Sequence, residues 1–296
     1  MTATATPPVT LPAEPLGPGG IVWYAAGDQR ALLLAVRLLL HQVAHPMVGA
    51  GVEQQSVYKT DPYGRLWRTT QSVVRSVYGG RAAAEEGQRL LRMHASIRGT
   101  DAQGRSYHAL NPQAYAWVHW TAYEGTRLFL RDFGPGLTDE QDQQLFEEWQ
   151  RLGLLIGVRP DQLPETREEF WAGWREQLPR LENNPVVQDI LYAAPRAPRW
   201  LPVPRRWADA ALQRLASPML ALQRDVIAAT LDPDFRARIG LPAPSRRTRR
   251  RVAGLRLVSR LGNGLPEPVR LAPLALLRGR RTRRDGTTRP EPVPYP

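Results

Sequence analysis

Hydrophobic positions recur every three to four residues along most of this chain, which is the spacing of amphipathic helices. A clear example is the segment 31–45, ALLLAVRLLLHQVAH, which Asp28 is placed to cap and Pro46 to end. The sequence has no alternating runs of β-branched residues bounded by turn signals, which would indicate strands. The pattern therefore predicts an all-α fold.

Capping signals divide the rest of the chain into further helices. Asp61-Pro62 opens one that Gly79-Gly80 should end, and Asn111-Pro112 opens another. Two capping boxes begin helices at Thr138 and Thr166, each with Gln or Glu three residues later. The remaining helices are expected over residues 81–98, 184–192, 205–216, 218–231 and 246–261.

These segments form one domain with two flanks. Residues 1–20 are rich in Pro and Gly and are expected to be a flexible lead, residues 21–275 form the all-α domain, and residues 276–296 are a basic tail containing prolines. The lead lacks the features of a signal peptide. The longest apolar stretch, 31–40, is ten residues long, whereas about 20 span a bilayer. We therefore expect no transmembrane segment and a cytoplasmic protein.

The net charge of +12 is concentrated in residues 241–296, which hold 14 arginines and three acidic residues. The segment 245–261 is typical of a nucleic-acid or membrane-surface patch. The alternative is a terminal helix with arginines on its wet side. That helix would pack its apolar residues on the body, namely Val252, Leu255, Leu257, Val258 and Leu261. Because residues 241–294 contain no aromatic side chain for base stacking, no nucleic-acid partner is predicted.

The chain has no cysteine, so any metal or cofactor must be held by His, carboxylate, Tyr or Met. His41 and His45 are spaced like the zinc ligands of a metalloprotease, but Gln42 replaces the Glu that would act as general base. Both histidines are therefore expected to be structural, each with a hydrogen-bond partner. His119 is surrounded in sequence by aromatic residues, as in a core helix or the wall of an apolar cavity.

His94 lies on a mostly apolar helical stripe with Leu90, Leu91 and Ile97. It is either a buried histidine bonded to a carbonyl or an axial ligand of haem iron. Arg98, one turn further on, is expected on the same helical face, where it could pair with a propionate or a carboxylate.

A second polar group lies near the start of the helix predicted over 62–78. Arg65 and Thr69 are spaced four residues apart, and Arg68 lies beside them. The three form either a solvated basic edge or a site for an anion, because their apolar neighbours disfavour unpaired charge.

Six short motifs follow one another in a fixed order. They are HP-x-V-x-x-GV from residue 45, DP-x-x-RL-x-RT from 61, RMH-x-x-IRG from 92, NP-x-x-x-x-WVH-x-T from 111, LG-x-x-x-GV from 152 and LP-x-T-x-x-EF from 163. Together they resemble the MpaB-like and rubber-oxygenase (latex-clearing protein) family over about residues 25–275. The resemblance implies an all-α fold around haem b (iron protoporphyrin IX) and dioxygen-dependent cleavage of carbon–carbon double bonds in isoprenoid chains.

The same resemblance implies roles for five residues. His94 is expected to be the proximal haem ligand and therefore the metal ligand, with Arg65 and Arg98 binding the cofactor. Arg68 and Thr69 are expected to be catalytic, stabilising charge that develops during oxygen chemistry. Rubber oxygenases have a Lys that can reach the distal iron site where this chain has Arg68. A guanidinium has no lone pair to give iron, so we expect a resting iron that is five-coordinate or water-bound.

The sequence thus predicts a haem-dependent oxygenase that uses dioxygen on a small apolar or unsaturated, isoprenoid-like substrate. It identifies neither the electron donor nor the oligomeric state. Two alternatives stay open, namely a non-catalytic haem sensor or carrier, and a helical interaction protein that uses its Arg-rich C-terminal region.

Overall fold

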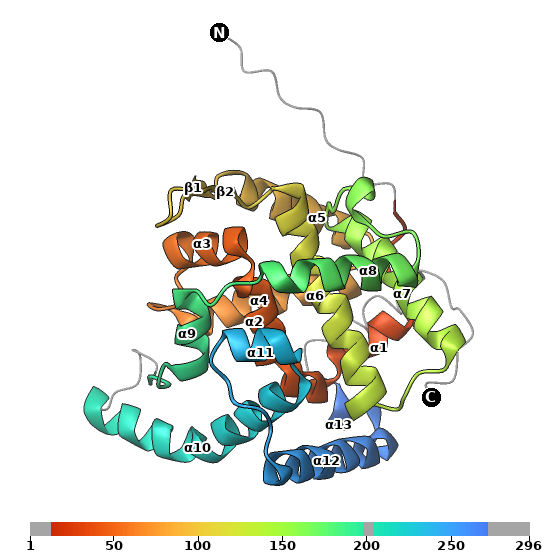
Figure 1. The fold of residues 1–296 in the computed structure, drawn as a ribbon. Helices are drawn as coiled ribbons and strands as arrows, with labels where there is room; N and C mark the ends of the chain where they lie inside the picture. Colours follow the sequence, from red (N-terminus) through yellow and green to blue (C-terminus); the bar gives the residue numbers. More distant parts are fainter. Residues whose placement is uncertain (1–12, 198–203, 272–296) are drawn as a thin grey trace.

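The computed structural model of the protein describes residues 13–197 and 204–271, and within them it is mostly helical (Figure 1). The predicted all-α class is confirmed, apart from one small hairpin. The helices are α1 (Ile21–Gly27), α2 (Ala35–Ala44), α3 (Pro46–Gln55), α4 (Pro62–Tyr78), α5 (Ala82–Ala95), α6 (Pro112–Leu128), α7 (Asp139–Leu155), α8 (Arg167–Gln177), α9 (Pro185–Tyr192), α10 (Arg205–Thr230), α11 (Pro233–Arg238), α12 (Arg246–Leu261) and α13 (Glu267–Arg270).

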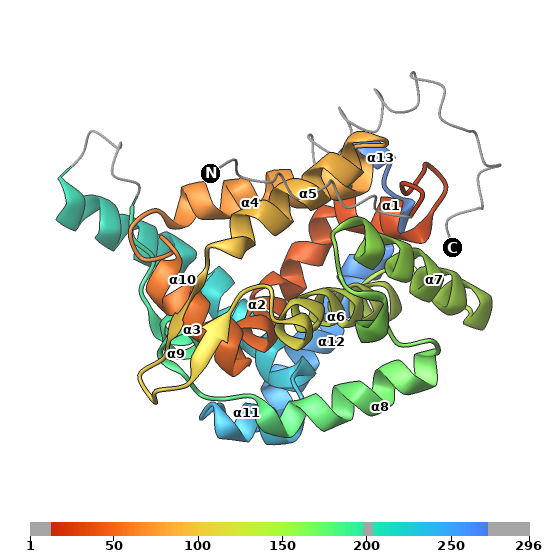
Figure 2. The same ribbon diagram turned by 90° about the horizontal axis from the view of Figure 1, so that it is seen from above.

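Helices α2 and α6 pack against each other at the centre of the molecule (Figures 1 and 2). A buried ion pair joins them, with Arg37 Nη2 2.8 Å from Glu124 Oε1. The indole of Trp117 on α6 donates to the His41 carbonyl of α2 at 2.8 Å and stacks on Trp174 of α8, with the ring centroids 4.8 Å apart. The Arg37 and Glu124 charges and the Trp117 indole N–H are therefore all partnered, as burial requires.

The predicted caps fix most helix ends. Asp61 accepts from the Gly64 amide and opens α4 over 62–78, as expected. Asp28 accepts from the Arg30 amide, but residues Gln29–Leu34 form a 3₁₀ helix before α2 begins. The box at Thr138 is complete. At Thr166 only half of it forms, because the Glu169 carboxylate accepts instead from the Glu165 amide.

The helix predicted over 81–98 is too long at its C-terminal end. Helix α5 ends at Ala95, and the chain continues into an antiparallel hairpin of β1 (Arg98–Thr100) and β2 (Ser106–His108). The Asp101 carboxylate accepts from the amides of Gln103 and Arg105 and so fixes the turn, which also needs the positive φ of Gly104. Strands of three residues are too short to give an alternating pattern.

Two further predictions are corrected. Helix α10 is continuous through Pro218, where two helices were expected. The residues around Pro218 are exposed, so water can satisfy the carbonyl that lacks a proline N–H. Helix α12 has the predicted bounds. Of the five apolar residues expected to pack on the body, however, only Val252 is buried and Leu255 is half-buried, while Leu257, Val258 and Leu261 are exposed.

Helix α1 is held by a residue far away in sequence. The Glu148 carboxylate on α7 accepts from the amides of Ile21 and Val22 at 3.1 and 2.8 Å. The Trp23 ring then packs edge-on against Tyr78 of α4, and the Tyr78 hydroxyl donates to the Trp23 carbonyl. Helix α1 thereby fixes one end of α4.

Among the described residues, no single helix is long and apolar enough to cross a membrane. The pair Gln29–Ala44 and Pro46–Gln55, bent by 101°, passes that test only when both parts are taken together. Most of the predicted lead and all of the predicted tail, 276–296, lie outside the described residues.

Candidate functional site

The predicted site residues lie on a hairpin of two helices. Helices α4 and α5 run antiparallel, side by side along one edge of the molecule (Figure 2). Ser72 donates to the Glu86 carboxylate at 2.6 Å, and Arg75 forms an ion pair with Glu86 at 3.6 Å. Counting the same number of residues back along α4 and forward along α5 from these contacts places residues 65–69 of α4 beside the last turn of α5. The fold therefore brings Arg65, Arg68 and Thr69 to the same end of the hairpin as His94.

The His94 imidazole has one nitrogen engaged. It lies half-buried on the inward stripe of α5 that includes Ala83 and Gly87, and its Nδ1 is 2.8 Å from the Leu90 carbonyl. Because a carbonyl only accepts, Nδ1 carries the proton and Nε2 keeps its lone pair. Burial lowers the pKa of His94, which favours this neutral, ligand-competent form.

Arg65 is a half-buried cation with no ion pair or side-chain hydrogen bond to any described residue. Burial, and then the neighbouring charge of Arg68, lowers its pKa. Both effects show that the guanidinium lies where an anion would stabilise it. Arg68 itself is exposed and is 3.2 Å from the Asp61 carboxylate, and Thr69 is also exposed.

Arg98 does not lie where the sequence placed it. It was expected one helical turn beyond His94 on the same face, but α5 ends at Ala95 and Arg98 lies in β1, paired with His108. Its side chain is exposed and has no ion pair to a described residue. The strand, and not the helix, therefore sets the direction of this side chain.

Tyr115 is a neighbour of His94 that sequence reasoning missed. The two rings meet edge-on with centroids 5.7 Å apart, and the Tyr115 hydroxyl donates to the Ile156 carbonyl at 2.7 Å. Burial raises the pKa of Tyr115 to about 12, so it stays a neutral donor. No local signal could have found this contact, because it joins α5 to α6. The bond from His94 to Leu90, in contrast, follows from the four-residue spacing.

Two other histidines, His41 and His119, are buried, and His45 is half-buried. His41 Nδ1 lies 3.1 Å from the Arg37 carbonyl, as expected of a histidine with a partner. The expectation of a partner is wrong for His45, because its Nδ1 atom is buried and has no hydrogen-bond partner among the described residues. The Nε2 atom of His119 is also buried without a partner among them. Within the described residues, no group of three or more His, Cys, Asp or Glu could hold a metal ion.

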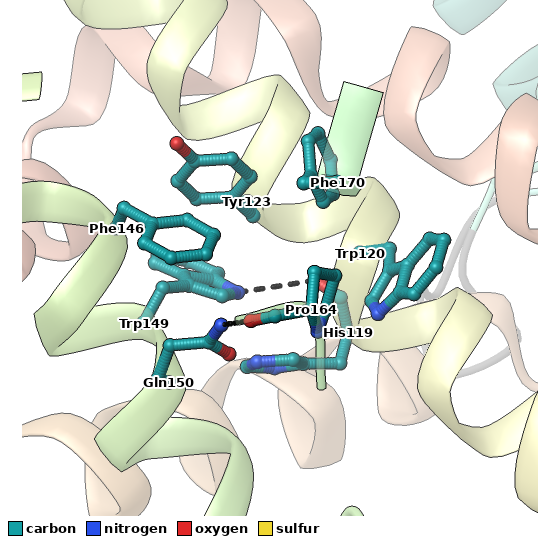
Figure 3. A pocket seen from close by; sticks show the side chains of 8 residues that line it. All are labelled: His119, Trp120, Tyr123, Phe146, Trp149, Gln150, Pro164 and Phe170. Atoms are coloured by element: carbon teal, nitrogen blue, oxygen red, sulfur yellow. Dashed lines mark hydrogen bonds between the residues drawn. The ribbon is translucent and has the colours of Figure 1, made fainter. Parts of the chain in front are cut away.

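Two cavities lie away from His94. His119 lines a void of about 10 Å³ enclosed by aromatic rings (Figure 3), where it stacks on Trp149 at 5.6 Å and accepts from that indole through its carbonyl at 3.1 Å. Such a void has room for about one water molecule. A larger cavity of about 320 Å³ lies between residues 29–33 and α10, lined by Leu32, Leu33, Met219 and Leu222 among others.

Comparison with known proteins identifies the domain. The family described as "ER-bound oxygenase mpaB/B'/Rubber oxygenase, catalytic domain" matches residues 23–261. Two relatives are similar along their length, namely "Uncharacterized protein Rv2237" of Mycobacterium tuberculosis and "Uncharacterized protein Mb2261" of Mycobacterium bovis. Each is 26% identical over 244 residues, which cover 78% of this chain and 89% of the relative. No solved structure matches the chain significantly.

The matched region extends from α1 to the end of α12 and so includes the α4–α5 hairpin and all five predicted site residues. The predicted resemblance is confirmed. The chain therefore belongs to the family of mpaB and rubber-oxygenase catalytic domains, and its domain is of the oxygenase type.

Proposed function

We propose that this protein is a haem b-dependent oxygenase that uses dioxygen to oxidise a small apolar or unsaturated, isoprenoid-like substrate, with cleavage of a carbon–carbon double bond as the expected reaction. The observation that carries the proposal is the state of His94 in a domain of the oxygenase family. Its imidazole is neutral and half-buried, and the Leu90 carbonyl fixes the tautomer that leaves Nε2 available to a metal.

The donor set fits haem. A porphyrin supplies most of the iron's ligands itself, so the protein would need to provide one nitrogen ligand and cationic partners for the two propionates. His94 is that ligand. Arg65 is a half-buried cation that lacks an anion, and Arg98 is exposed at the strand that follows α5. The hairpin also exposes apolar side chains that an apolar substrate would cover, namely Leu66, Trp67, Val73 and Met93.

Each residue then has a distinct task. His94 Nε2 would hold the iron, and the Leu90 carbonyl, which fixes the ring through Nδ1, would make the imidazole a better donor. Arg65 and Arg98 would pair with the propionates. When bound, haem supplies the redox chemistry that activates dioxygen. Arg68 and Thr69 would donate hydrogen bonds to charge that develops during the oxygen chemistry, and Arg68 would not ligate the iron because its guanidinium stays protonated.

The test is haem retention by matched histidine variants. Purified protein is reconstituted with haem b, desalted, and measured by its Soret absorbance and by a pyridine haemochrome assay. His94→Ala should lose the bound haem, whereas His108→Ala, a half-buried histidine on β2, should keep it. A full Soret band in His94→Ala without added imidazole would refute the assignment.

A second measurement separates catalysis from sensing or transport of haem. The reduced holoprotein is given a polyunsaturated isoprenoid, and dioxygen uptake and carbonyl products are followed. Uptake that depends on substrate supports the oxygenase. Stable haem binding without uptake across apolar alkenes favours the sensor or carrier.

A further inference from the structure

The outward face of α12 combines unpaired arginines with exposed apolar side chains. Leu257, Val258 and Leu261 expose 61%, 66% and 72% of their surface in the last turns of the helix. Arg246, Arg247, Arg249 and Arg250 are exposed in its first turns and form no ion pair with any described residue. We call these seven residues the α12 face.

The arginines of the α12 face differ from those that hold the helix to the body. Arg251 forms an ion pair with Asp225 at 3.1 Å, and Arg256 with Asp132 at 2.7 Å. Val252 and Ser259 are buried on the same inward side, with the Ser259 hydroxyl donating to the Phe133 carbonyl at 2.7 Å. These contacts attach the helix without the α12 face, whose arginines form no ion pair with any residue that the structure describes.

The position of the four arginines is unfavourable in water. The first turn of α12 contains no acidic residue, although the positive end of the helix dipole repels cations there. An external anionic surface relieves this repulsion, so the charge is complementary to a negative partner. The three apolar side chains indicate that the partner also offers an apolar layer next to its anions.

Further exposed apolar side chains line the cavity next to α10. Arg30 donates to the Ser259 carbonyl and to Asn263 at the end of α12, and the same Arg30 lines the cavity of about 320 Å³. Leu32 and Met219, which also line this cavity, are exposed. Helices α10 and α12 lie along one side of the molecule (Figure 1).

We propose that the α12 face docks the protein on the surface of an anionic lipid bilayer. The arginines contact phosphate headgroups, and the Leu and Val side chains enter the boundary between headgroups and acyl chains. A duplex nucleic acid offers phosphates but no accessible apolar layer, and residues 241–294 contain no aromatic side chain that could stack on bases. The proposal concerns location on a membrane and is independent of haem binding.

The test uses the full-length protein and vesicle flotation. Vesicles are phosphatidylcholine alone, or phosphatidylcholine with a quarter phosphatidylglycerol, at several NaCl concentrations. Binding should need the anionic lipid and weaken with salt. The charge variant Arg246→Gln, Arg247→Gln, Arg249→Gln, Arg250→Gln should bind about tenfold more weakly or worse. The apolar variant Leu257→Gln, Val258→Gln, Leu261→Gln should lose about tenfold at unchanged net charge.

The matched control is a variant that changes four exposed arginines outside α12 to Gln, namely Arg81, Arg92, Arg151 and Arg175. It should weaken vesicle binding less than about threefold, because these charges lie off the docking face. Every changed side chain is exposed, so each variant should fold, and circular dichroism checks this.

Three results would overturn the proposal. The first is equal binding of the apolar variant and the unmodified protein to anionic vesicles. The second is a change of oligomeric state in the apolar variant by light scattering, which would make the α12 face an interface between copies. The third is duplex DNA binding tighter than vesicle binding at physiological salt and retained by the apolar variant.

Discussion

Removing the Glu148 carboxylate should destabilise the domain by opening the start of α1. This carboxylate accepts from two backbone amides, those of Ile21 and Val22, and both residues are buried. In Glu148→Ala the two amides lose their charged acceptor inside the protein. A hydrogen bond to a charged group contributes about 1.5–3 kcal/mol, so we expect a loss of about 3–5 kcal/mol in the free energy of unfolding.

The assay is urea unfolding followed by far-ultraviolet circular dichroism. The slope of the unfolding free energy against urea concentration should be the same in the variant and the unmodified protein, which checks that both unfold in two states. Glu147→Ala is the matched control. Glu147 is the exposed neighbour on α7, and its one hydrogen bond, from Gln143, is also exposed. Its loss should change stability by less than about 0.5 kcal/mol.

The effect should also reach the candidate site, because Trp23 of α1 packs on Tyr78 of α4. Hydrogen exchange should accelerate first at Ile21 and Val22 and then along α4. If Glu148→Ala loses less than about 1 kcal/mol, or no more than the Glu147 variant, the carboxylate does not hold α1 and this reasoning fails.

Three further predictions concern burial. Burial lowers the pKa of His119 to about 3 and that of His45 to about 4. The unfolded chain therefore binds protons first, and stability should fall as pH drops below about 6.5, by about 2 kcal/mol for each histidine at pH 5, measured by urea unfolding at each pH. A constant free energy over this window would contradict the assigned burial. Gly87→Ala should lower the free energy of unfolding by about 1–3 kcal/mol, because the new Cβ would overlap the Leu155 carbonyl oxygen. Gly254→Ala on α12 is the matched control. Its new Cβ meets nothing within 4 Å, so it should stabilise the protein slightly. Equal thermal shifts in the two variants would refute that packing argument. For Glu86, burial acts to raise the pKa, but hydrogen bonds from Arg89 and Ser72 outweigh it and the pKa is lowered. The ionised Glu86 therefore stabilises the fold at pH values above the ordinary carboxyl pKa, and this stabilisation is lost on acidification. The difference in unfolding free energy between the unmodified protein and Glu86→Gln should narrow as pH falls. A difference independent of pH would argue against the ion pair.

The sequence determined the helical class and most helix ends, because these depend on local signals. A cap such as Asp61 needs only the amide of Gly64, three residues away, and α4 accordingly has its predicted bounds. The hydrogen bond from His94 to the Leu90 carbonyl is equally local, since residues four apart meet on a helix. The ordered motifs were also sufficient to identify the oxygenase family.

Tertiary structure decided the features that join distant segments. The placement of Arg98 on a strand depends on a turn fixed by Asp101, and the contact of Tyr115 with His94 depends on how α5 meets α6. The same holds for α12. Its periodicity predicts an apolar stripe, but contacts with the body bury only Val252 and part of Leu255, and they leave Leu257, Val258 and Leu261 exposed. Helical spacing fixes which residues share a face, whereas only packing against other elements determines which face is covered.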